Sequence, residues 1–92
     1  MNPKQIENAR HALGLPNENK RSYRNRFVTG PGSIDYLHWM QMVTDGHARR
    51  LDGSKSQLTG GDDYFWLTTE DAIAALEPGE KLDQEDFPGA RP

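Results

Sequence analysis

Apolar positions recur at helical spacing near the start of the chain. Ile6, Ala9 and Leu13 fall on one face of a helix that Asn2 is well placed to cap. A glycine and a proline follow shortly afterwards and prevent the helix from continuing. The pattern therefore predicts a first helix over about residues 3–13.

A second stretch with helical spacing follows a Gly-Pro-Gly sequence. Ser33 is a favourable N-cap and Gly46 is favourable just after the last turn, so a helix is predicted over about residues 34–45. The core-facing stripe is expected to consist of Tyr36, Trp39, Met40 and Val43, with Leu37 beside it. The other side of the helix is expected to carry Ile34, His38, Gln41 and Asp45.

The segment after this helix has the pattern of two strands joined by a turn. Residues 48–51 form a short basic run, and Asp52-Gly53 is a typical tight-turn sequence. Residues 64–67 carry large apolar side chains at consecutive positions, which indicates a strand that is apolar on both faces. We expect these two runs to pair in an antiparallel sheet.

A helix start follows the second strand directly. Thr68 and Asp71 have the spacing of a capping box, so a short helix is predicted over residues 69–76. Ile73 and Leu76 are expected to face the core. A Pro-Gly pair then ends the helix.

Between the first two helices, aromatic and basic residues alternate. Tyr23, Asn25 and Phe27 are separated by Arg24 and Arg26. This alternation predicts a short half-buried strand with the arginines on its solvent side. A helix of one and a half turns is the alternative, because Tyr23 and Phe27 are also four residues apart.

These elements together predict a small α+β domain with three helices and a two- or three-stranded antiparallel sheet. With 92 residues, of which 34% are hydrophobic, the chain can form one domain with a small core. The domain is expected over residues 1–79, and residues 80–92 are expected to form an acidic tail containing Pro and Gly, held by Leu82 and Phe87. Formation of a homodimer is one way in which so small a core could gain further burial.

Several classes of function are disfavoured by what the sequence lacks. There is no cysteine, so disulfides and thiolate metal sites are excluded. His11, His38 and His47 share no metal-ligand spacing, and no P-loop, dinucleotide-binding fingerprint or catalytic triad is present. No apolar run is long enough to span a membrane, and the N-terminus lacks the pattern of a signal peptide. We therefore expect a cytoplasmic, non-enzymatic protein without catalytic residues, metal or cofactor.

Basic side chains gather in two places, although the net charge is −3. The candidate nucleic-acid-binding residues are Lys20, Arg21, Arg24, Arg26, Arg49, Arg50 and Lys55. Such cations can neutralise phosphates, and aromatic neighbours can stack on bases. The alternative is that the first group merely solvates the outside of a strand, and that the second protects an exposed edge strand from aggregation.

The order of elements from residue 33 to residue 76 resembles the second half of a winged helix-turn-helix domain of the MarR and PadR kind. In those families a recognition helix ends in a glycine, and a basic strand and a hairpin wing follow. The return strand then runs into a Leu-Thr pair that caps the next helix. The matching parts here are residues 42–46, 48–51 and 65–76. Residues 23–28 and 58–63 also resemble parts of small uncharacterised phage and prophage proteins.

The winged-helix resemblance implies a small binding module, with DNA as the first candidate partner. DNA would be contacted through residues 20–26 and the wing. The alternative is a phage-encoded adaptor or inhibitor that binds a host protein and makes no DNA contact. The net negative charge, the acidic outward face of the helix over residues 34–45 and the acidic tail favour this alternative, whereas the basic N-terminal half and the wing favour DNA.

Overall fold

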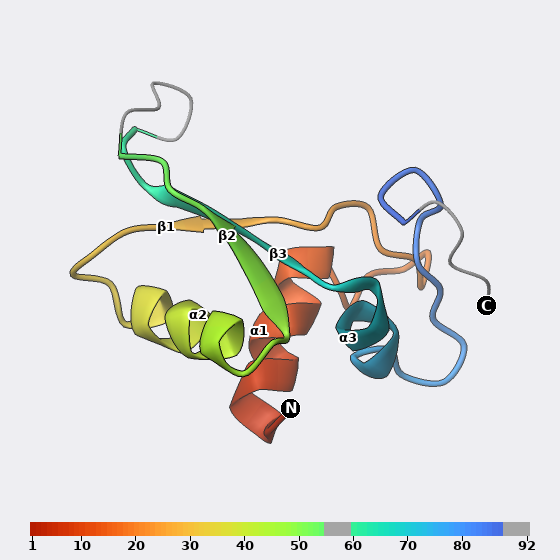
Figure 1. Cartoon of the computed structure of the whole chain (residues 1–92). Helices are drawn as coiled ribbons and strands as arrows, with labels where there is room; N and C mark the ends of the chain where they lie inside the picture. The colour runs from red at the N-terminus through yellow and green to blue at the C-terminus, as the bar shows by residue number, and fades with distance from the viewer. Residues whose placement is uncertain (55–59, 88–92) are drawn as a thin grey trace.

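Three helices and a three-stranded antiparallel sheet make up the described part of the chain, residues 1–54 and 60–87, in the computed structural model (Figure 1). The fold class is therefore the small α+β class that the sequence predicts. In chain order the elements are α1 (Pro3–Leu13), β1 (Phe27–Thr29), α2 (Ile34–Thr44), β2 (Ala48–Leu51), β3 (Asp63–Leu67) and α3 (Thr69–Ala74).

The central strand of the sheet is β3, because the strand order is β1-β3-β2 and both pairings are antiparallel. Ala48 lies opposite Leu67 and Leu51 lies opposite Tyr64, which confirms the predicted pairing of residues 48–51 with residues 64–67. On its other side β3 pairs with β1, where Phe27 lies opposite Phe65.

Each helix begins at the cap that its sequence predicts. The side chain of Asn2 accepts a hydrogen bond from the backbone N–H of Gln5 in a capping box, and α1 covers the predicted residues. The side chains of Ser33 and Thr68 cap α2 and α3 by accepting a hydrogen bond from the backbone N–H of Asp35 and of Asp71, respectively. The helices α2 and α3 end one and two residues earlier than expected, at Thr44 and Ala74.

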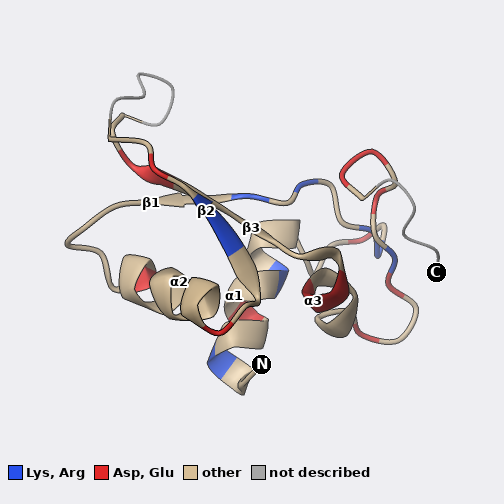
Figure 2. Ribbon diagram, in the orientation of Figure 1, with Lys and Arg blue, Asp and Glu red and all other residues tan. Residues whose placement is uncertain are grey.

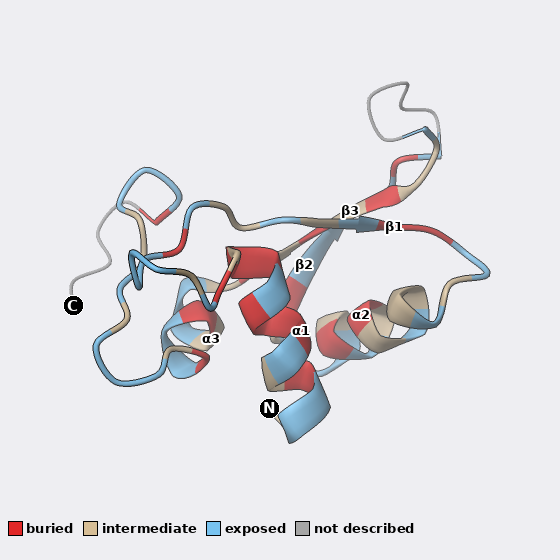
Figure 3. Cartoon of the chain, turned by 180° about the vertical axis from the view of Figure 1, so that it is seen from behind, coloured by how far each residue is buried: buried red, intermediate tan, exposed pale blue. Residues whose placement is uncertain are grey.

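The helices α1 and α2 lie against one face of the sheet, and the core fills the space between them (Figures 1 and 3). Trp39 of α2 is at the centre of this core. Its ring lies 5.4 Å from the ring of Phe27 and 5.7 Å from the ring of Phe65, measured between centroids. Such aromatic contacts contribute beyond the area they bury.

The buried face of α2 differs from the predicted stripe. Trp39 is fully buried as expected, but Met42 is equally buried, while Met40 is half-buried and Leu37 is 68% exposed. Met42 lies about 60° around the helix from Trp39, on the side away from Met40. Since α1 packs against α2 as well as against the sheet, the buried face turns toward Met42.

The other residues that were predicted to lie in the core are also only partly as expected. Phe65 and Leu67 are buried, and Tyr36, Val43 and Leu76 are half-buried against the core. The expectation for Ile73 was wrong, because its side chain is 45% exposed. The buried residues here are instead two small ones, Ala72 of α3 and Ala75, which caps the end of this helix.

The segment before β1 is only partly the strand that the alternation predicts. Regular pairing begins at Phe27, and the alternative short helix does not form. The side chain of Asn25 takes the place of a ladder pair, since its Nδ2 donates to the carbonyl of Leu67 and its Oδ1 accepts from the N–H of Leu67. Pairing of β1 with β3 therefore stops at this side chain.

Tyr23 does not enter the core as the alternation suggested, because its side chain is 61% exposed. Its ring instead lies against Gly14, the residue that ends α1. Gly14 has a left-handed φ of 78°, and a Cβ at this position would clash with the tyrosine ring. The tyrosine thus packs on the end of α1 rather than under the sheet.

Residues 80–87 pack against the rest of the chain. The backbone at Lys81 pairs with the backbone at Arg21 in an isolated parallel β-bridge. The side chain of Phe87 is buried, and that of Leu82 is half-buried against the core. The guanidinium of Arg10 in α1 donates from Nη2 to Oε2 of Glu80 over 2.8 Å, so α1 is joined to this segment by a buried ion pair. Residues 88–92 of the expected tail lie outside the described residues.

Replacement of Trp39 by Ala should destabilise the domain by about 3–5 kcal/mol, because a fully buried large ring is lost from the centre of the core. Leu37→Ala, on the exposed side of the same helix, should change the stability by less than about 0.5 kcal/mol. Chemical denaturation of the two variants and the original chain measures both values. Equal stabilities for the two variants would contradict the assigned buried face of α2.

Candidate functional site

The face of the sheet opposite the core carries aromatic and apolar side chains that are exposed or half-buried. Along β3, Asp63, Phe65 and Leu67 are buried, while Tyr64 and Trp66 between them are half-buried. Because side chains of a strand alternate between its two faces, Tyr64 and Trp66 point away from the helices. Their partners in the sheet point the same way. We call this set the open sheet face: Val28, Arg49, Leu51, Tyr64 and Trp66.

Aromatic and apolar side chains meet at the centre of the open sheet face. The rings of Tyr64 and Trp66 are 5.8 Å apart and inclined by 56°. Leu51 lies opposite Tyr64 and is 62% exposed, and Val28, on the other side of Tyr64, is also exposed. An apolar cluster left on the surface of a small protein commonly marks an interaction site.

A hollow of about 450 Å³ lies beside these rings. Its lining combines the sheet with the C-terminal segment and consists of Asn25, Leu51, Tyr64, Trp66, Glu85 and Asp86. Burial raises the pKa of the Asp86 carboxyl, the nearby charge of Asp83 raises it further, and Arg26 acts in the opposite direction. The hollow thus joins an aromatic wall to an acidic rim.

The first predicted basic group lies along the segment between α1 and β1, where Figure 2 shows blue stretches of ribbon. Lys20, Arg21 and Arg26 of this segment are exposed. Arg24 has a structural role instead. Its Nη2 donates to the backbone carbonyl of His11 over 2.7 Å, and its guanidinium lies 5.1 Å from the centre of the Tyr23 ring. Arg24 therefore holds this segment against the end of α1.

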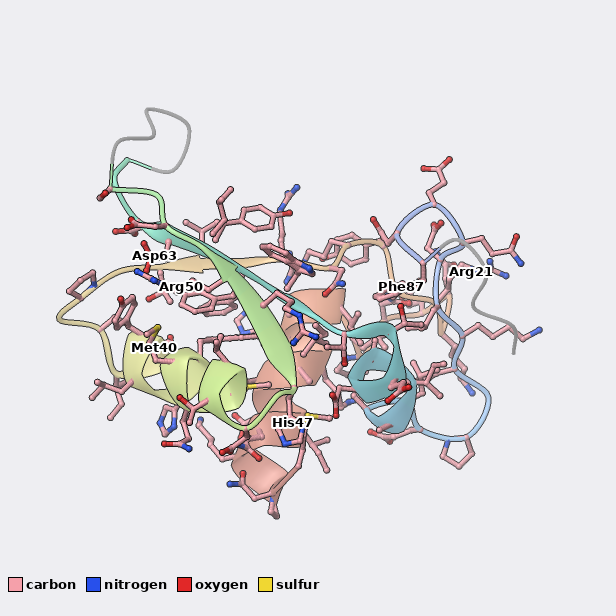
Figure 4. The ribbon with its side chains drawn as sticks, viewed as in Figure 1. Arg21, Met40, His47, Arg50, Asp63 and Phe87 are labelled. Carbon is pink, nitrogen blue, oxygen red and sulfur yellow. The ribbon has the colours of Figure 1, made fainter. Side chains whose placement is uncertain are left out.

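The second predicted basic group is divided between the two faces of the sheet. Arg49 belongs to the open sheet face, opposite Trp66. Arg50, the next residue, lies beside Asp63 near the base of the hairpin, with its Nε 2.6 Å from Oδ2 of Asp63 (Figure 4). Because consecutive residues of a strand point to opposite faces of the sheet, the two arginines do not form one basic patch. Lys55 lies outside the described residues.

The carboxylate of Asp63 organises the base of the hairpin. Its Oδ1 accepts a hydrogen bond from the N–H of Gly53, and its Oδ2 accepts from Arg50 and from the hydroxyl of Tyr36. Burial alone would raise the pKa of Asp63, but the hydrogen bonds from Gly53, Arg50 and Tyr36 outweigh it and lower the pKa below its ordinary value. The positive charge of Arg50 is therefore balanced by the carboxylate of Asp63.

The residues of the hollow were not among the predicted site residues. The signal in the sequence was the consecutive run of large apolar residues at 64–67, which indicated apolar side chains on both faces of β3. The described helices α1 and α2 cover one face only, so the other aromatic side chains remain at the surface. Glu85 and Asp86 could not be associated with them, because only the packing of residues 80–87 brings these carboxylates to the sheet.

The chain matches no known family model, and it shows no significant similarity to curated proteins or to solved structures. Within residues 1–54 and 60–87, no group of three or more histidine or carboxylate side chains is arranged to hold a metal ion. None of the helices in the same residues has both the length and the apolar character needed to cross a bilayer.

The lowered pKa of Asp63 predicts a loss of stability in acid. A carboxyl whose pKa is lower in the folded state stabilises the fold above its unfolded pKa, and this contribution disappears as the pH falls from about 4 through the folded pKa. Asp63→Asn should therefore unfold more easily than the original chain at pH 7, and its stability should fall less steeply in acid.

Denaturation curves of both proteins between neutral and acidic pH measure this difference. Glu80 also has a lowered pKa, chiefly because Arg10 donates hydrogen bonds to it, and so the original chain loses stability from more than one group. The difference between the pH profiles of the original chain and of Asp63→Asn gives the part of the stability lost in acid that is due to Asp63. Parallel pH profiles for the two proteins would show that the Asp63 cluster contributes nothing.

Proposed function

We propose that this chain is a small, non-catalytic protein-binding module of the cytoplasm and that its open sheet face is the binding surface. The observation that carries the proposal is the pair Tyr64 and Trp66, half-exposed on the central strand and bordered by Arg49 and Leu51. Trp, Tyr and Arg are the residues that most often dominate the binding energy of protein interfaces. A catalytic role has no support from any cluster described above.

The arrangement of α2, β2, β3 and α3 supports a domain of winged-helix type. The helix α2 is followed by a left-handed glycine, Gly46, and by the basic strand β2, and β3 runs into Leu67-Thr68, which caps α3. In this interpretation α2 corresponds to the recognition helix. A phage-encoded adaptor or inhibitor of a host protein is the setting that the sequence resemblance suggests.

The outward face of α2 favours a protein over DNA. This helix contains no Lys or Arg, and its exposed side chains include the apolar Ile34 and Leu37. A helix that reads the major groove uses hydrogen-bonding side chains for the bases and cations for the phosphates. Asp35 near the start of α2 would also repel a phosphate.

DNA is the second candidate partner, because the segment before β1 presents a row of exposed cations. Lys20, Arg21 and Arg26 are exposed there, and none of them forms an ion pair with another described residue. Binding through such cations alone would be independent of sequence and would weaken steeply with salt. Arg24 and Arg50 make contacts within the fold, so fewer cations are available to bind phosphates than the sequence suggested.

Capture from an extract of the native host distinguishes the two candidates. The tagged chain is used with and without nuclease treatment, beside the variants Trp66→Ala and Ile73→Ala. Ile73 is an exposed apolar residue of α3 outside the open sheet face, so its variant controls for a general loss of surface hydrophobicity. We expect a protein partner that survives nuclease treatment, binds the Ile73→Ala variant normally and binds the Trp66→Ala variant at least about tenfold more weakly.

Two results would contradict the proposal. Undiminished capture by a Trp66→Ala variant that melts cooperatively would show that the open sheet face is not the binding surface. Capture that disappears with nuclease, and that the double variant Arg21→Ala with Arg26→Ala also loses, would identify nucleic acid as the ligand.

A further inference from the structure

The hollow beside Trp66 has walls that suit a cation. The rings of Tyr64 and Trp66 are inclined toward each other at 56°, so they form two sides of a corner rather than a flat surface. Both rings remain half-exposed, and Leu51 extends the apolar lining. The faces of aromatic rings attract ammonium and guanidinium groups, and this attraction increases where water is excluded.

The rim of the same hollow is acidic. Glu85 and Asp86 line it from the C-terminal segment, and neither carboxylate has a hydrogen-bond or ion-pair partner among the described residues. Asp83 adds to the negative charge around Asp86, and Arg26 offsets part of it. Arg49, opposite Trp66, is a second cation near the hollow. Among the described residues, however, those that line the hollow include two carboxylates and no cation, so the lining itself is negative.

We propose that this hollow accepts an arginine or lysine side chain from the protein partner, held between the Tyr64 and Trp66 rings and the Glu85 and Asp86 carboxylates. This inference rests on the proposed protein-binding function and names the chemistry of the partner at one position. An arginine fits best, because its planar guanidinium can stack on an aromatic ring while its edge donates hydrogen bonds to carboxylates.

Other occupants would use the hollow less well. A phosphate would meet the carboxylates of Glu85 and Asp86 at close range, which is unfavourable in any partly desolvated site. An uncharged aliphatic side chain would bury these carboxylates without a partner. Arg49 lies opposite Trp66 on β2, outside the lining of the hollow, and is free to meet an acidic group elsewhere on the same partner.

The indole N–H signals of the two tryptophans provide a direct test by NMR. The probe is a capped Gly-Arg-Gly peptide, and the matched control is the same peptide with citrulline, which has nearly the shape of arginine without its charge. The arginine peptide should shift the Trp66 indole signal saturably and leave the signal of Trp39 unchanged, because Trp39 is fully buried. A Trp66→Phe variant assigns the two signals.

The citrulline peptide should cause no saturable shift. The double variant Glu85→Gln with Asp86→Asn should lose the response to the arginine peptide, while its Trp39 signal shows that the fold is intact. An absent response to arginine, or an equal response to citrulline, would overturn the assignment of the hollow. A shift caused by oligothymidine but not by the arginine peptide would overturn it in favour of a nucleic-acid base.

The test separates this inference from the proposed function. If Trp66→Ala abolishes protein capture but the arginine peptide does not bind, the open sheet face stands as a protein-binding surface and the basic partner side chain is rejected. If the arginine peptide binds but capture does not depend on Trp66, the hollow stands and the assigned partner surface is rejected.

Discussion

In the described part of the chain, helices cover one face of the sheet and leave the other face open, and the rest of the structure depends on this constraint. The central strand β3 is hydrogen-bonded on both sides, and α1 and α2 lie against one of its faces. Strand alternation then divides its aromatic side chains. Phe65 enters the core beside Trp39, and Tyr64 and Trp66 face outward. The same five residues of β3 thus provide both the centre of the core and the centre of the candidate binding surface.

Two buried carboxylates complete the fold around this layer. Glu80 pairs with Arg10 and joins α1 to the C-terminal segment, while Asp63 joins Arg50, Tyr36 and the turn at Gly53. Both carboxyls have lowered pKa values, in which hydrogen bonds to the charged form outweigh burial. Because Arg10 and Arg50 are paired in these contacts, they are less available to a ligand than the unpaired cations are. The Arg10 contact in addition fixes residues 80–87, which carry the acidic rim of the hollow.

Most of the architecture could be predicted from local signals. Caps, turn sequences and periodicity indicated the helices and the pairing of β2 with β3, because these depend on residues close together in the chain. The errors concern contacts between distant elements. The packing of α1 turned the buried face of α2 toward Met42, and the Asn25 side chain stopped the pairing of β1. The candidate site was harder to predict, since Trp66 and Asp86 meet only through the folded C-terminal segment.

The central claim is that the open sheet face contacts a protein, and photo-crosslinking at position 66 measures this most directly. Benzoylphenylalanine in place of Trp66 keeps a large aromatic side chain at the site, and the same group in place of the exposed Glu70 on α3 provides the control. After irradiation in the native host, position 66 should give a discrete crosslinked protein that position 70 does not give. The absence of any crosslink at position 66, or a crosslink to nucleic acid, would contradict the claim.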